Sequence, residues 1–141
     1  MRPISTFLLF ILLLGCQDSS NESFSGPTAL TAKKQHDLGE GIAITISNES
    51  NAPLLLQTCC GSDLVYHLDR YESGRWALYT SHDVPCTKAC PSGILYVSQS
   101  HPHESIIGYE INAPGTYRFR LLTGDDSGST KELTSNSFTV E

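Results

Sequence analysis

The residues of this sequence best suited to chemistry are four cysteines and one histidine. Cys59 and Cys60 are adjacent, Cys86 and Cys90 form a C-x-x-x-C segment, and His82 lies four residues before Cys86. In an oxidising compartment such cysteines form disulfides. Adjacent cysteines have Cα atoms about 3.8 Å apart, which would strain a bridge between them. We therefore expect Cys59 and Cys60 each to form a disulfide with a cysteine of the C-x-x-x-C segment. The sequence leaves both possible pairings open.

The same residues could instead bind a metal ion. Thiolates and imidazoles are ligands of copper and zinc, and this alternative uses Cys59, Cys60, Cys86, Cys90 and His82. A redox enzyme has less support, because the C-x-x-C pattern of thiol oxidoreductases is absent. Structural disulfides are the preferred interpretation, with no metal and no cofactor.

No other part of the sequence carries a catalytic motif. The chain has no G-x-S-x-G, H-E-x-x-H, phosphate-loop or EF-hand pattern. Asp125 and Asp126 are typical of a solvated turn, since calcium requires about six or more oxygen ligands. His67 alternates with leucines along a predicted strand, which favours a surface or edge histidine. The sequence therefore predicts no catalytic residue and no enzyme.

The N-terminal residues 1–15 have the order of a signal peptide. A single positive charge precedes the apolar run 7–14, and a small glycine precedes Cys16. The apolar run is shorter than the roughly 20 residues that cross a bilayer as a helix. The tetrapeptide Leu-Leu-Gly-Cys that ends at Cys16 resembles the lipobox of bacterial lipoproteins. This resemblance implies cleavage before Cys16 and its lipidation, which also accounts for the odd fifth cysteine.

Residues 16–27 are polar and turn-forming, which predicts a flexible tether behind the lipid. Acyl chains contribute about 0.8 kcal/mol for each buried CH₂, so a multiply acylated Cys16 would anchor the protein to a membrane. In a Gram-negative cell, Gln17 replaces the aspartate that usually keeps such lipoproteins at the inner membrane. The outer membrane, facing the periplasm, is then expected. The formal net charge of −6 argues against binding to nucleic acid or to anionic lipid.

Residues 28–141 predict one all-β domain, because their apolar residues alternate with period 2 rather than 3.6. The segment 116–122 has the clearest pattern, with Tyr117, Phe119 and Leu121 facing inward and its two arginines facing water. Strands are expected over 41–48, 51–58, 63–71, 75–80, 93–99, 104–111, 116–122 and 136–141, with Ile107, Tyr109 and Ile111 on one face and a polar loop over 123–135. Seven to eight short strands separated by turns predict a single antiparallel β-sandwich.

Two stretches resemble bacterial immunoglobulin-like domains. "PGTYRFRLL" followed by "NSFTVE" resembles their last two strands, and "YHLDRYESGRWALYT" is similar to their middle hairpin, with Trp76 just after the turn. The resemblance implies that Tyr117 is a corner tyrosine whose hydroxyl bonds to nearby backbone. Phe119 occupies the place where antibody domains carry a cysteine, so no intersheet disulfide is expected there.

These features together predict a membrane-anchored lipoprotein whose immunoglobulin-like domain is a non-enzymatic binding or structural module of the cell envelope. The expected surface for an envelope protein partner is the cysteine-rich region 57–63 and 81–93, with Trp76 and Tyr79 nearby if they are exposed. Core packing is the favoured alternative for both aromatic side chains. Three alternatives stay open: a copper- or zinc-binding lipoprotein, an inhibitor of an envelope protease, and an accessory subunit of an enzyme. Fold analogy alone does not choose among them.

Overall fold

The computed structural model describes residues 26–82, 86, 89–124 and 130–141. These residues form strands without any helix, and so include no helix able to cross a membrane. The strands are β1 (Pro27–Thr31), β2 (Gln35–His36), β3 (Ile42–Asn48), β4 (Leu54–Cys59), β5 (Asp63–Leu64), β6 (Tyr66–Glu72), β7 (Arg75–His82), β8 (Ser92–Val97), β9 (His103–Ile107), β10 (Gly115–Gly124), β11 (Thr130–Thr134) and β12 (Phe138–Val140). The expectation of an all-β domain is confirmed.

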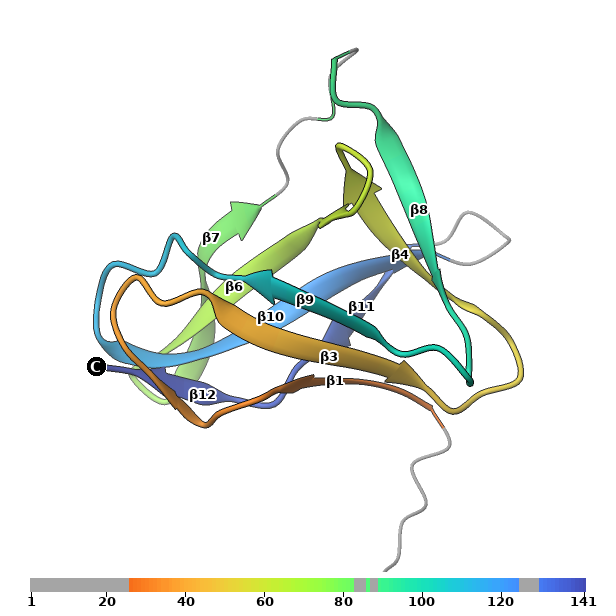
Figure 1. The fold of residues 1–141 in the computed structure, drawn as a ribbon. Helices are drawn as coiled ribbons and strands as arrows, with labels where there is room; N and C mark the ends of the chain where they lie inside the picture. The colour runs from red at the N-terminus through yellow and green to blue at the C-terminus, as the bar shows by residue number, and fades with distance from the viewer. Residues whose placement is uncertain (1–25, 83–85, 87–88, 125–129) are drawn as a thin grey trace, which may run out of the picture.

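The strands form two sheets that face each other (Figure 1). The smaller sheet is antiparallel and has the order β1-β3-β9. In the larger sheet, β10 pairs with β6 and β4 along one edge and with β11 and β12 along the other. β7 extends this sheet beyond β6, and β2 adds a parallel pair to β12, so the larger sheet is mixed.

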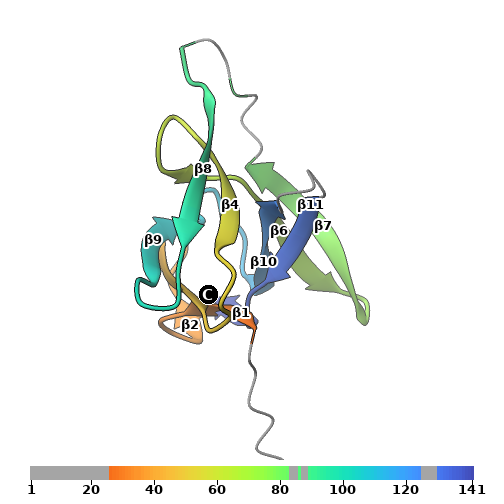
Figure 2. The same cartoon turned by 90° about the vertical axis from the view of Figure 1, so that its right-hand side faces the viewer.

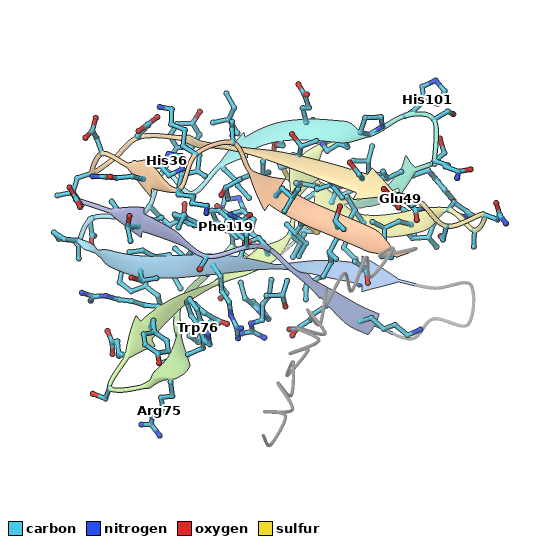
Figure 3. The ribbon with its side chains drawn as sticks, turned by 90° about the horizontal axis from the view of Figure 1, so that it is seen from below. His36, Glu49, Arg75, Trp76, His101 and Phe119 are labelled. Carbon is cyan, nitrogen blue, oxygen red and sulfur yellow. A yellow bond between two sulfur atoms is a disulfide. The ribbon has the colours of Figure 1, made fainter. Side chains whose placement is uncertain are left out.

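The space between the sheets is filled by apolar side chains that the period-2 sequence pattern predicted to face inward. Tyr117 and Phe119 of β10 are fully buried, and Phe138 of β12 packs 5.1 Å from Phe119 between ring centroids. Ile42, Ile44 and Ile46 of the facing strand β3 are also buried. Figure 3 shows Phe119 between the two layers. Inward-facing side chains on alternate residues of the strands thus form one continuous apolar core.

β4 and β8 form an antiparallel ribbon whose far end projects beyond the sandwich, while its inner side chains, such as Leu56 and Val97, belong to the core. β4 pairs with β8 along its whole length, from Leu54 opposite Val97 to Cys59 opposite Ser92, but only Leu55 and Leu56 pair with β10. The far end of β8 therefore rises above the rest of the molecule (Figure 2). The described chain begins at the opposite end, beside the start of β1 (Figure 1).

Several strands differ from the sequence prediction. The structure has twelve strands rather than seven to eight, partly because short pairings such as β2 and β5 leave no alternation to detect. β11 lies within the predicted polar loop, since its pairing with β10 needs backbone groups and not apolar side chains. The predicted strand 104–111 ends at Ile107, where Gly108 has a φ of 80°. Tyr109 is consequently exposed rather than on the buried face of Ile107 and Ile111.

Candidate functional site

The four cysteines of the domain form two disulfides, Cys59–Cys86 and Cys60–Cys90. Their Cα atoms are 5.6 Å and 4.5 Å apart, and the bridges close loops with sequence separations of 27 and 30. This confirms the predicted cross-linking of the CC pair to the C-x-x-x-C segment. It also selects one of the two crossings that the sequence left open.

Adjacent cysteines reach the same segment because the strand ends between them. β4 ends at Cys59, Cys60 then has a φ of 52°, and Gly61 has a φ of 93°. Left-handed backbone at two successive residues turns the chain, so the side chains of Cys59 and Cys60 no longer point to opposite faces. The amide of Cys60 also donates a hydrogen bond of 3.2 Å to the carbonyl of Pro91. We call the described residues joined by the two disulfides, 59–61, 86 and 89–92, the stapled tip.

His82, the fifth residue of the alternative metal set, does lie beside the stapled tip. It lines a cleft with Cys59 and Cys60, and its ring stacks on that of Tyr66 at 4.9 Å between centroids. All four sulfur atoms are used in disulfides. Among the residues that the structure describes, no three histidine, cysteine or acidic side chains are close enough to hold a metal ion. Binding of copper or zinc by these thiolates would therefore require both disulfides to be reduced first.

Next to the stapled tip, β8 exposes two large apolar side chains. Ile94 is 54% exposed and Tyr96 is 66% exposed, on the face of the ribbon turned away from the core. They lie opposite Gln57 and Leu55 of β4. The predicted surface stopped at residue 93 and missed them. Their alternation in "GILYVSQ" was visible, but alternation alone does not say which face of a strand is covered.

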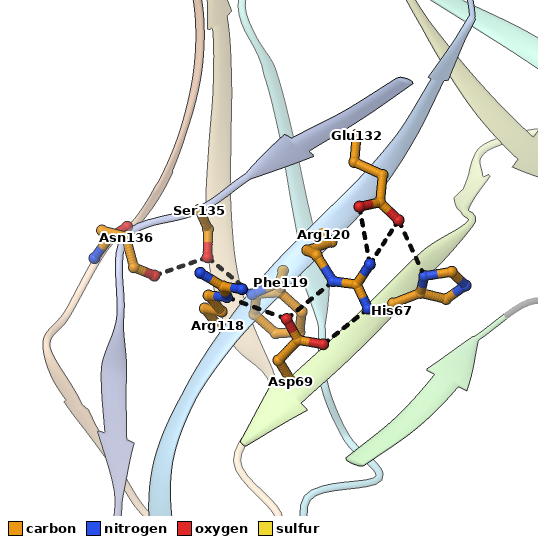
Figure 4. A network of polar contacts seen from close by, with 8 residues as sticks. All are labelled: His67, Asp69, Arg118, Phe119, Arg120, Glu132, Ser135 and Asn136. Carbon is orange, nitrogen blue, oxygen red and sulfur yellow. Dashed lines mark hydrogen bonds and ion pairs between the residues drawn. The ribbon is translucent and has the colours of Figure 1, made fainter. Parts of the chain in front are cut away.

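The two arginines of β10 do not simply face water, as the alternation predicted. The carboxylate of Asp69 is almost fully buried between them, and its oxygens accept bonds from Arg118 Nε at 3.1 Å and from Arg120 at 2.9 Å (Figure 4). Arg120 also donates to both oxygens of Glu132 at 2.7 and 2.8 Å. The register explains the contact, because Arg118 is paired with Asp69 across β10 and β6. The sequence prediction failed because it treated the strands separately.

Hydrogen bonds shift the pKa values of two groups in this network. The bonds that Arg120 donates to Asp69 and then to Glu132 raise the pKa of its guanidinium, and the bond from Arg120 lowers the pKa of the Glu132 carboxyl. His67 lies at the end of the network, with its Nδ1 3.4 Å from Glu132, and is partly covered rather than free on the surface. The outer face of the larger sheet thus carries a connected network of partly exposed charges.

Trp76 lies on the same outer face and away from the stapled tip. The guanidinium of Arg118 stands over its ring at 4.4 Å from the centroid, and Tyr71 contacts it edge-on at 5.2 Å. Figure 3 shows Trp76 on the β6–β7 hairpin, outside the layer that contains Phe119. Trp76 is the second residue of β7, just after the turn, whereas His82 ends that strand beside the stapled tip, so Trp76 does not lie near the cysteines. Tyr79 points inward, against Tyr117.

The remaining predicted residues have structural positions. The hydroxyl of Tyr117 donates 2.7 Å to the carbonyl of Ala113, four residues earlier, which is the backbone bond expected of a corner tyrosine. Phe119 is in the centre of the core. The predicted lipidation site Cys16 and the carboxylates Asp125 and Asp126 lie outside the described residues.

Comparison with known proteins gives no relative for this chain. No protein-family model matches it, and neither the curated proteins nor the solved structures contain a significant match. The function must therefore be inferred from the site itself.

Proposed function

We propose that this protein is a lipid-anchored, non-enzymatic binding module of the cell envelope, which contacts another envelope protein through its stapled tip and the adjoining face of β8. The observation that carries the proposal is an exposed apolar pair, Ile94 and Tyr96, on a ribbon whose end is held by two disulfides. Soluble proteins seldom hold large apolar side chains out on a rigid projection unless another surface covers them.

The direction of the ribbon supports the same function. The described chain starts beside the end of β3, with Pro27 opposite Asn48, whereas the stapled tip is at the other end of β4 (Figure 1). A tether that joins a lipidated Cys16 to β1 would let the tip point away from the membrane. Rigid loops at one end of a sandwich are a common location for binding.

The order of the strands supports an immunoglobulin-like domain as the scaffold. The sheet β1-β3-β9 and the facing run β7-β6-β10-β11 resemble the two sheets of such domains. The β4–β8 ribbon is an addition to that plan. Cys59 ends β4, Cys60 follows it, and Cys86 and Cys90 precede β8, so the two disulfides fix the end of this addition.

The first experiment is an intact-mass and thiol measurement on protein purified from membranes without reductant. We expect a chain that begins at an acylated Cys16, lacks four hydrogens, has no reactive thiol and contains no copper or zinc. Reactive thiols or stoichiometric metal would contradict the disulfide assignment and favour the metal-binding alternative. An uncut or unacylated N-terminus would contradict the lipid anchor.

The binding role is tested separately, by a photo-crosslinking amino acid placed at Tyr96 in cells. We expect one discrete adduct that disappears when Ile94 is changed to serine. The matched control is the same probe at Leu30, which is 54% exposed on β1 near the start of the described chain. A ladder of adducts that is identical for Tyr96 and Leu30 would contradict a dedicated surface on the ribbon.

A further inference from the structure

The outer face of the larger sheet carries a second site, independent of the stapled tip and of the proposed function. We propose that Arg118, held between Asp69 and Trp76, binds a carboxylate side chain of a partner protein, with Tyr71 and Leu78 as the apolar surroundings of that contact. The occupant is an aspartate or glutamate that is flanked by apolar or aromatic side chains. The basis of this inference is the guanidinium of Arg118, which is held in place and has unused hydrogen-bond donors.

The guanidinium of Arg118 is held from two sides. Its Nε donates 3.1 Å to Asp69, whose side chain is only 4% exposed, and its plane stands over the ring of Trp76 at 4.4 Å. Its side chain retains 28% exposure. Within the part of the chain that the structure describes, its two terminal nitrogens have no hydrogen-bond partner. A planar fork with two terminal N–H edges matches a carboxylate, which it binds in a bidentate manner.

Arg120 provides an internal comparison. Its guanidinium donates to both oxygens of Asp69 and to both oxygens of Glu132, so its donors are used within the protein. Arg118, one position further along the same face of β10, has a single bond to Asp69. The two arginines therefore have different roles. Arg120 completes the network, whereas Arg118 is oriented by Asp69 and keeps unused hydrogen-bond donors.

The surroundings favour a protein as the source of the carboxylate. Leu78 lies opposite Asp69 and is 58% exposed, and Tyr71 lies opposite Trp76 and is 48% exposed. Tyrosine, tryptophan and arginine are the residues that most often dominate binding energy at protein interfaces. A phosphate-rich membrane surface would instead require several unpaired cations, and the outer face offers one pre-oriented fork.

On the outer face, the charge available to a partner's carboxylate is that of Arg118. The chain carries a net charge of −6, which repels acidic surfaces in general. Arg120 is matched by Asp69 and Glu132, and Arg70 and Arg75 alternate with Asp69 and Trp76 and so lie on the other face of the hairpin. A partner's carboxylate would therefore be bound by Arg118 itself and not by a general positive charge of the face.

The only tryptophan of the chain is part of the site, so its fluorescence reports occupancy directly. The probe is a tryptophan-free random peptide library displayed on phage and selected on the purified full chain. We expect selected peptides to contain Asp or Glu next to aromatic or aliphatic residues. Their synthetic forms should change the emission of Trp76 on titration.

Arg118→Lys is the decisive variant, because it keeps the charge and loses the planar fork. We expect the Kd of the selected peptides to rise at least about tenfold, and Tyr71→Ala, which alters an exposed side chain, to weaken binding as well. Arg75→Lys is the matched control on the same hairpin and should leave the Kd unchanged, since Arg75 and Trp76 point to opposite faces of β7. Selection of no peptides, of peptides without carboxylates, or of peptides insensitive to Arg118→Lys would overturn the proposal.

Discussion

The two faces of β10 are built from one strand, yet they are stabilised by different forces. On the inner face, Tyr117, Phe119 and Leu121 are buried among the aromatic and aliphatic side chains of both sheets. On the outer face, Arg118 and Arg120 are joined to the carboxylates of β6 and β11. The inner face gains from apolar burial, which is insensitive to pH, whereas the outer face depends on ionised groups. The alternation of one strand thus separates apolar packing on one face from a network of ionised side chains on the other.

The largest expected effect is on the inner face. Phe119→Ala should lower the free energy of unfolding by about 3–5 kcal/mol, because it leaves a cavity between Tyr66 and Phe138, whose rings pack on it. Urea unfolding followed by circular dichroism measures the change. The control Leu78→Ala removes an exposed apolar side chain of the outer face and should alter stability by no more than about 0.5 kcal/mol. Equal effects of the two variants would contradict the assignment of the core.

The central contact of the outer face should have the second largest effect. Asp69→Asn keeps the shape of the side chain but removes the charge that both arginines bind, so we expect a loss of about 1.5–3 kcal/mol in the free energy of unfolding. Glu132→Gln is the matched control. It removes a carboxylate that is 38% exposed and should cost less than about 1 kcal/mol. If the two variants cost the same in urea unfolding, the buried position of Asp69 contributes nothing to stability.

The contrast between the faces also explains what the sequence could predict. The inner face was predictable because burial follows from the alternation of Tyr117, Phe119 and Leu121 within one strand. The outer network was not, because the pairing of Arg118 with Asp69 joins residues 49 positions apart and depends on the register of β10 against β6. The strand β11 was missed for the same reason, since its backbone pairing leaves little hydrophobic pattern.

The stapled tip lies between these extremes. The cross-link between the CC pair and the C-x-x-x-C segment was predictable from the geometry of adjacent cysteines. The choice of Cys59–Cys86 and Cys60–Cys90 was not, because it depends on the left-handed backbone of Cys60. The exposed position of Tyr96 could not be predicted either, since the alternation of β8 does not say which of its two faces is covered.

Loss of the Tyr117 hydroxyl should have a smaller effect on the free energy of unfolding. Tyr117→Phe removes only the hydroxyl that donates to the carbonyl of Ala113, so the free energy of unfolding should fall by about 1 kcal/mol. The ring stays in the core, and the slope of unfolding against urea should not change. Tyr96→Phe is the control on an exposed tyrosine, and it should have no measurable effect. A neutral Tyr117→Phe variant would show that ring burial alone holds this corner.

The smallest expected effect is the pH dependence of the stability that Glu132 contributes on the outer face of β10. The bonds from Arg120 lower the pKa of the Glu132 carboxyl below its ordinary value of 4.5, so the ionised form is favoured in the folded state. Its contribution to stability is therefore complete above 4.5 and is lost as the pH falls through the lower, folded pKa. The difference in unfolding free energy between the native chain and Glu132→Gln should accordingly be present near neutral pH and shrink in acid. The loss of unfolding free energy in Phe119→Ala should be the same near neutral pH and in acid, because no ionisable group is removed from the inner face. If the Glu132→Gln difference persisted in acid, it would reflect packing, and the two faces of β10 would not differ in the way their charges predict.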